Sequence, residues 1–296
     1  MKYIENALVE INTWEKAGPG FLSGVAGFIL KPAEKAAGAM IPDGIKEAVG
    51  KAVEGGLSFL STQTAKTLKN DGIHVSATKK SLGDLLATQK GKSRRKPSKK
   101  SLADQLEAAD KEAQEVWNWH ISYAVTEGAA TGSLGIFGLA ADIPALMGIL
   151  IREIQAIACC YGYDPTQERE REYILRILQA GTATTVVDKA VFVVGLKQFE
   201  QILLKVAWRR MTEALAAKQI SKQSLLAAIR QFAKTLGIQI TKRKALQMIP
   251  VIGALVGGCF NGMFANDIGK AAYMNYRRRW IAEHANTQLE DEGKKA

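Results

Sequence analysis

Glycines spaced four residues apart constrain the fold of this chain more than any other feature of its sequence. Such pairs are Gly20/Gly24, Gly128/Gly132, Gly253/Gly257 and Gly258/Gly262. Residues four apart lie on one face of a helix, and a face without side chains lets a second helix pack at short range. The spacing therefore predicts tightly packed helices, in a soluble bundle or within a membrane.

The remaining composition also favours helices over strands. Aromatic residues make up only 7% of the 296 residues, and no segment sustains an alternation of apolar and polar residues. Apolar residues instead recur at helical spacing, from Leu203 to Leu215 and from Leu225 to Leu236. We therefore predict an all-α, multi-helix bundle with Gly-rich central helices, about eight to ten helices in all, and few or no strands.

Local signals place two helix starts. Ser101 is a suitable N-cap for a helix that runs to about residue 126, and Asp104 lies in its first turn. Further along, Asp164 is a suitable N-cap, Pro165 suits the first helical position, and Gln167 sits where a capping box places it.

The sequence divides into three parts that we expect to form one continuous domain. Residues 1–70 are predicted to form N-terminal helices that pack on the core, beginning with a short amphipathic helix over 1–16. Residues 71–100 predict a basic linker or mobile loop, and residues 101–290 predict the helical core.

The positive charge of the chain is concentrated in one segment. The formal net charge is +11, and Lys90–Lys100 carries seven basic residues and no acidic one. Without them the rest of the chain would carry about +4. An anionic membrane surface or lipid is the expected partner, with a solvated linker as the alternative. Specific nucleic-acid recognition is not expected, because no aromatic residues are interleaved with the charges.

A second group of basic residues lies near the C-terminus, beside tyrosines and a tryptophan. Arginines and amphipathic aromatic rings favour the membrane interface. The residues that we expect at a membrane surface are Lys92, Arg94, Arg95 and Lys96 from the first group and Arg277, Arg278, Arg279 and Trp280 from the second.

The stretch 245–266 contains no charged residue and is long enough to span a bilayer. Its polar residues, its glycines and Pro250 favour a buried helix instead. Glu5 and Glu10 precede any apolar run, which argues against a secretory signal. We therefore expect a cytoplasmic protein, peripheral on the inner face of the membrane.

The three cysteines have no metal-binding spacing, so we expect buried thiols and neither metal nor cofactor.

Several of these patterns together resemble the EcsC family of bacterial proteins. The central motif consists of Gly128, Thr131, Gly132, Gly135, Gly138, Leu139, Asp142 and Pro144. Similar stretches follow at 154–165, at 249–261 and at 271–280, so the resemblance covers about 115 to 285. The family takes its name from a gene neighbouring two components of an ABC transporter. The resemblance implies no established activity and supplies no catalytic residue.

Asp142 is the most suggestive carboxylate, because it lies between a Gly-rich segment and an apolar helix, where an unpaired charge is costly. It is interpreted as a helix N-cap or a partner of Arg152, or alternatively as a site acid or cation ligand. The candidate ligand-binding residues are Thr131, Gly132, Asp142, Arg152 and Asn261. No nucleophile elbow, HExxH or P-loop occurs, so we do not expect an enzyme, and catalytic residues are unknown.

Three hypotheses of function remain open. The leading one is a membrane-associated helical protein that serves a transporter or other membrane protein, or binds a lipid-like ligand. The second is a membrane-inserting toxin or effector, with 128–161 or 245–266 as the inserting hairpin. The third is an enzyme that uses Asp142 between the Gly-rich helices. The oligomeric state is not specified by the sequence.

Overall fold

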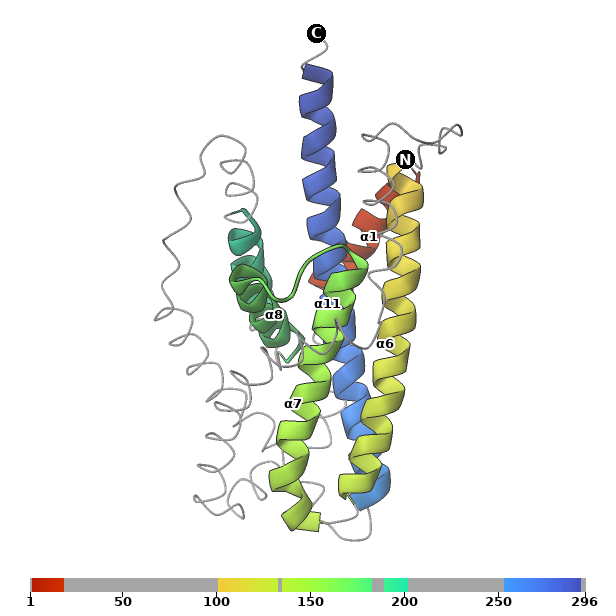
Figure 1. Ribbon diagram of the computed structural model, residues 1–296, viewed down its shortest axis with the longest axis vertical. Helices are drawn as coiled ribbons and strands as arrows, with labels where there is room; N and C mark the ends of the chain where they lie inside the picture. Colours follow the sequence, from red (N-terminus) through yellow and green to blue (C-terminus); the bar gives the residue numbers. More distant parts are fainter. Residues whose placement is uncertain (1, 19–100, 133–134, 183–188, 202–252, 294–296) are drawn as a thin grey trace, which may run out of the picture.

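The computed structural model describes residues 2–18, 101–132, 135–182, 189–201 and 253–293 (Figure 1). Every regular element within these ranges is an α-helix, which confirms the predicted all-α bundle. The helices are α1 (Lys2–Lys16), α6 (Leu102–Gly132), α7 (Gly135–Cys160), α8 (Glu168–Gly181) and α11 (Gly253–Gly293). The segment 189–201 is also helical. The basic segment 90–100 and the expected helices over 203–236 lie outside the described residues.

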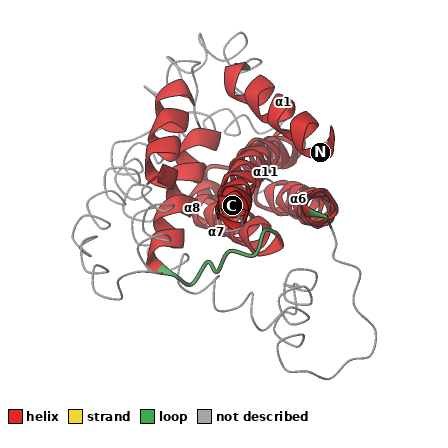
Figure 2. Ribbon diagram, turned by 90° about the horizontal axis from the view of Figure 1, so that it is seen from above, coloured by secondary structure: helices red, strands yellow, loops and turns green. Residues whose placement is uncertain are grey.

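Helix α11 is the centre of the described bundle. Seen from above, α1, α6, α7 and α8 surround it (Figure 2), and all four contact it. Its 41 residues extend for about 60 Å. Gln114 in the first half of α6 bonds to Tyr273 of α11, and Glu127 near the end of α6 bonds to the earlier Asn261, so α6 and α11 are antiparallel.

Glycines on α11 allow α6 to approach closely. A Cβ added at Gly258 would lie 2.9 Å from the carbonyl oxygen of Val125 and 3.3 Å from Ala129 Cβ, and one added at Gly262 would meet the Val125 side chain. Such distances leave no room for a larger residue. The Gly258/Gly262 pair therefore has the close-packing role that its spacing predicted.

The core is one continuous apolar cluster to which all the described helices contribute. Helix α7 supplies the fully buried Leu146, Leu150, Ile154 and Ile157, spaced at three and four residues. At about 25 cal/mol per Å² of apolar surface, this burial is the main force that holds the helices together.

Two predicted helix starts have different outcomes. The Ser101 prediction is confirmed: Ser101 Oγ accepts a bond from the Asp104 amide at 3.2 Å, and Asp104 Oδ2 accepts one from the Ser101 amide at 3.1 Å. The Asp164 prediction is wrong, because α8 begins at Glu168 and its N-cap is Gln167. Asp164 Oδ1 instead accepts bonds from the amide and the hydroxyl of Thr166, at 3.0 and 2.6 Å, and stabilises a turn before the helix.

Among the described helices, none combines the length and apolar character needed to cross a bilayer. Residues 253–266 of the uncharged stretch form the start of α11 and contain the buried Phe260 and Phe264. The rest of that stretch, 245–252, lies outside the described residues.

Candidate functional site

The predicted ligand-binding residues are distributed along three helices. Thr131 and Gly132 end α6, and Asn261 lies on α11 opposite them. Asn261 is fully buried and donates from Nδ2 to Glu127 Oε2 at 2.7 Å, while Thr131 Oγ1 donates to the Glu127 carbonyl oxygen at 3.0 Å. Glu127 therefore connects two of the predicted residues, and sequence analysis missed it.

Asp142 does not cap a helix. Helix α7 begins at Gly135, so Asp142 lies inside it, as does Pro144. The expected pair with Arg152 is also wrong, because ten residues of one helix separate the two by about 15 Å along its axis. Arg152 instead lies near His120 of α6. The structure thus brings Thr131 and Asn261 together around Glu127 and places Arg152 elsewhere on α7, while the surroundings of Gly132 and Asp142 lie outside those that it describes.

A buried carboxyl that the sequence analysis missed lies where α6, α7 and α11 meet. Glu153 of α7 is 0% exposed, and neither of its carboxyl oxygens has a hydrogen-bond partner among the described residues. Burial raises its pKa well above the ordinary value, because an apolar surrounding disfavours the charged form. The sequence signal was a single carboxylate in the otherwise apolar part of α7, beside Arg152.

Gly269 of α11 places this carboxyl next to an indole. A Cβ added at Gly269 would lie 2.5 Å from Trp117 Nε1 and would also meet Glu153 Oε1. The Trp117 N–H has no hydrogen-bond acceptor among the described residues. The carboxyl and the indole N–H therefore share one tightly packed point of the three-helix interface.

His120 lies one turn further along α6 and is neutral. Burial, together with the positive charge of Arg152, lowers its pKa to about 4. Nδ1 lies 2.8 Å from the Val116 carbonyl oxygen, so it carries the proton of the neutral ring and Nε2 is left as an acceptor. Nε2 has no donor among the described residues. Among the described residues, no basic side chain forms an ion pair with Glu153.

Three consecutive arginines of α11 form the most extensive polar network. Consecutive helical residues point about 100° apart, so Arg277, Arg278 and Arg279 face different neighbouring helices. Arg277 bonds to Glu10 of α1 at 2.5 Å and lies 2.8 Å from Asp110 of α6. Burial raises the pKa of Asp110, and the hydroxyls of Tyr3 and Tyr161, which donate to it at 2.8 and 2.7 Å, lower it in part.

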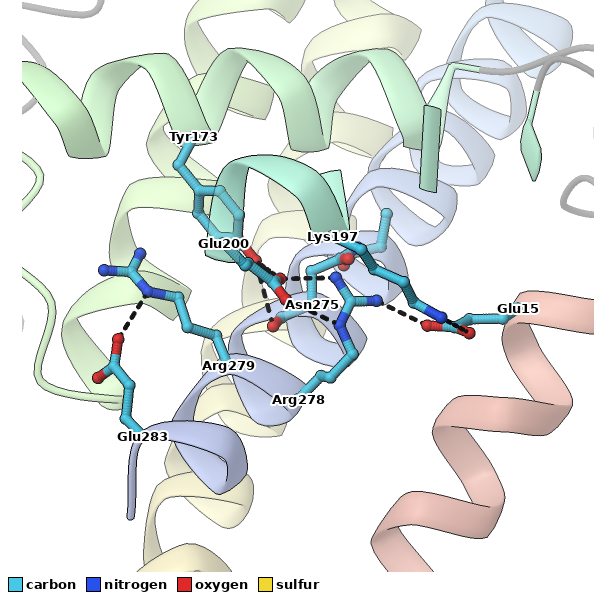
Figure 3. A network of polar contacts seen from close by, with 9 residues as sticks. Glu15, Tyr173, Lys197, Glu200, Asn275, Arg278, Arg279 and Glu283 are labelled. Atoms are coloured by element: carbon cyan, nitrogen blue, oxygen red, sulfur yellow. Dashed lines mark hydrogen bonds and ion pairs between the residues drawn. The ribbon is translucent and has the colours of Figure 1, made fainter. Parts of the chain in front are cut away.

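The other two arginines complete the network (Figure 3). Arg278 bonds to Glu15 of α1 at 2.7 Å and to Glu200 of the segment 189–201 at 2.6 Å. Arg279 bonds to Glu170 of α8 at 2.8 Å and to Glu283 at 3.0 Å. Among the described elements, the three side chains therefore connect α11 to α1, α6, α8 and the segment 189–201.

This burial corrects the expectation of an arginine cluster at a membrane surface. Arg277, Arg279 and Trp280 are 3%, 8% and 5% exposed, and Arg278 is intermediate. Their charges pair with carboxylates inside the bundle, and all of these except Glu283 are distant in sequence. The other predicted membrane-surface residues, Lys92, Arg94, Arg95 and Lys96, lie outside the described residues.

The described residues contain no group of three or more side chains able to hold a metal ion. Cys159 and Cys160 are buried as expected, and burial raises the pKa of the Cys160 thiol. The expectation of a buried thiol is wrong for Cys259, which is exposed.

The fold and the network define the class of protein: an all-helical bundle in which Gly-faced helices pack around a central helix that carries a buried arginine triplet. The chain belongs to the EcsC protein family, whose model matches residues 5–281. The match extends well beyond the part in which the sequence resemblance was noted.

Two proteins of Bacillus subtilis (strain 168) are similar to this chain. The uncharacterized protein YdbA is 36% identical over 160 residues, which cover 54% of this chain and 53% of that protein. Protein EcsC is 26% identical over 162 residues, which cover 55% of this chain and 59% of that protein. The alignments thus span little more than half of either relative. No solved structure matches the chain.

Proposed function

We propose that this protein is a peripheral membrane protein that binds anionic lipid through its basic segment 90–100 on the cytoplasmic face. The observation that carries the proposal is that the arginines 277–279 are not available to a membrane surface. The C-terminal triplet is paired with carboxylates inside the bundle. The seven basic residues of Lys90–Lys100, with no acidic residue among them, are therefore the main source of the net charge of +11.

The size of the expected attraction supports this proposal. Each basic residue near an anionic bilayer contributes about 1 kcal/mol, and the attraction falls off within a Debye length. Seven such residues in one short segment are enough to hold a protein at the surface without a spanning helix. The interaction should weaken steeply as the salt concentration rises.

Vesicle co-sedimentation tests the proposal. The variant Lys92→Gln, Arg94→Gln, Arg95→Gln, Lys96→Gln should lose up to about 4 kcal/mol of binding to phosphatidylglycerol vesicles, up to roughly a thousandfold in affinity. Neither protein should bind pure phosphatidylcholine strongly.

A matched control removes the same charge from the helices. Lys2, Lys16, Lys111 and Lys270 are exposed, and their joint replacement by Gln should change binding far less. Equal losses in the two variants, or no binding of the unmodified protein to either vesicle, would refute the proposal. Release of an entrapped dye by the unmodified protein would favour the membrane-inserting alternative.

A further inference from the structure

The exposed face of α6 changes character halfway along the helix. In the first half, its exposed residues include the charged Asp104, Glu107, Lys111 and Glu115. In the second half no exposed residue is charged: these residues are Asn118, Trp119, Ser122, Tyr123, Val125, Thr126 and Ala130. A water-facing helix ordinarily carries charged and polar residues on its outer face, without large aromatic side chains among them.

Large aromatic side chains lie on this uncharged face. Trp119 and Tyr123 are 56% and 50% exposed, and their rings stack with centroids 5.5 Å apart and planes inclined by 8°. Side chains of this size are normally buried, so their joint exposure indicates a contact surface.

The hydroxyl groups on the same face are turned back to the helix. Ser122 Oγ donates to the Asn118 carbonyl oxygen at 3.2 Å, and Thr126 Oγ1 donates to the Ser122 carbonyl oxygen at 3.0 Å. Such bonds satisfy a hydroxyl without water. The face is therefore less polar than its composition alone implies, and it can leave water at a small cost.

We propose that this face of α6, led by Trp119 and Tyr123, lies in the headgroup region of an anionic membrane; the inference rests on the proposed function and names its docking surface. Trp and Tyr prefer the bilayer interface, where the ring meets acyl chains and the polar atom meets headgroups. The basic segment 90–100 ends directly before α6. Its charge is complementary to the same anionic surface.

The dimensions of α6 favour a broad, flat partner. Leu102 and Trp119 are 17 positions apart, which places them about 26 Å apart along the helix axis. A bilayer is broad enough to meet both the basic segment, which ends before α6, and the aromatic pair further along. The uncharged second half of α6 would face the membrane, with the opposite side of the helix still packed on α7 and α11.

Vesicle binding of the double variant Trp119→Ser, Tyr123→Ser tests the docking surface. Its affinity for phosphatidylglycerol vesicles should fall by about tenfold or more, because the variant lacks the aromatic surface that membrane binding would bury. The variant should fold normally, since both side chains are exposed. The control is Val191→Ser, Val194→Ser, which removes apolar side chains of similar exposure, 62% and 54%, from another helix. It should bind like the unmodified protein.

Tryptophan fluorescence gives an independent measurement. The emission of the unmodified protein should shift to shorter wavelength when vesicles are added, and the Trp119→Phe variant should lose most of that shift while still binding.

The outcomes separate the two proposals. If the double variant binds vesicles as tightly as the unmodified protein, the docking surface is refuted while the basic segment can still carry membrane binding. If the unmodified protein does not bind anionic vesicles at all, the proposed function fails. If the double substitution instead dissolves a dimer and leaves vesicle binding unchanged, the face contacts a second copy and the inference is wrong.

Discussion

Arg277 Nε lies 2.8 Å from Asp110 Oδ2, and the two side chains are only 3% and 1% exposed. This ion pair joins the central helix α11 to α6 inside the bundle. Removing two charges from water is costly, so such a pair adds little net stability compared with apolar residues of the same size. Removing one partner is a different matter, because the other charge then stays buried alone.

We therefore expect Arg277→Met to lower the free energy of unfolding by about 3 to 5 kcal/mol. Adding Asp110→Asn should recover part of that loss, since it removes the isolated charge. Arg176→Met is the control, because the Arg176–Glu172 pair joins residues of one helix and Arg176 is 36% exposed; it should cost less than about 1 kcal/mol. Urea unfolding measures all three, and equal losses for Arg277→Met and Arg176→Met would contradict the expectation.

The arginine triplet shows which features of the site were predictable. The cap formed by Ser101 and Asp104 depends on residues three apart, and the sequence therefore revealed it. The partners of Arg277 and Arg278 lie as far as 267 and 263 residues away. Adjacent arginines typically lie on a surface, and only the packing of α1 and α6 against α11 makes these internal.

The predicted helix starts were wrong where the local sequence pattern fits both a helix N-cap and another local structure. Asp164 and Pro165 fit the start of a helix, but the Asp164 side chain bonds to Thr166 and the helix starts later, at Glu168. Asp142 looked like a cap because the glycines before it suggested a turn. Gly128 and Gly132 instead lie in α6, and Gly135 and Gly138 lie in α7.

Gly269 should not tolerate a methyl group. A Cβ there would lie 2.5 Å from Trp117 Nε1, part of a rigid ring, and would meet Glu153 Oε1 as well. We expect Gly269→Ala to destabilise the protein by about 1 to 3 kcal/mol. Gly195 is the matched control, since its Cβ would meet only Arg176 Nη1, at 4.0 Å. Gly195→Ala should stabilise the helical segment by about 0.5 to 1 kcal/mol. Thermal unfolding gives both values, and changes of the same sign would contradict the packing.

Glu153 should make stability depend on pH in a direction opposite to that of an ion-paired carboxylate. Burial raises its pKa well above the unfolded value of 4.5. The folded protein therefore keeps this proton at a pH where the unfolded chain has lost it. Stability from this group is fully present below pH 4.5 and falls as pH rises to the folded pKa, by up to about 1.4 kcal/mol per pH unit.

The variant Glu153→Gln keeps the shape of the side chain and removes this titration. Its stability relative to the unmodified protein should rise as the pH increases above the unfolded pKa of 4.5. Asp110 and Glu170 also have raised pKa values because of burial, so the difference between the two proteins is the quantity to measure. A flat difference for Glu153→Gln would show that Glu153 is ionised in the fold.

Lys189 should control how firmly α1 is held. Its Nζ donates to the carbonyl oxygens of Trp14, Ala17 and Gly18 at 2.5, 3.1 and 3.3 Å, and lies 4.3 Å from the centre of the Trp14 ring. A positive charge at a helix C-terminus also interacts favourably with the helix dipole. Loss of a hydrogen bond to a charged group costs about 1.5 to 3 kcal/mol. In Lys189→Met, the amides of α1 should therefore exchange with solvent about tenfold to a hundredfold faster, while those of α6 and α11 stay protected.

The control for this prediction is Lys197→Met. Lys197 bonds to Glu15 of the same helix at 2.5 Å but is 47% exposed, and Arg278 also holds Glu15. Exchange in α1 should therefore change by less than about fivefold in this variant, because exposed ion pairs contribute about 1 kcal/mol or less. If the amide exchange rates of α1 were unchanged in Lys189→Met, the ion pairs of Glu10 and Glu15 with the arginine triplet would be sufficient to hold α1 without Lys189. Faster exchange in all helices would mean that α1 unfolds together with the core and does not open as a separate unit.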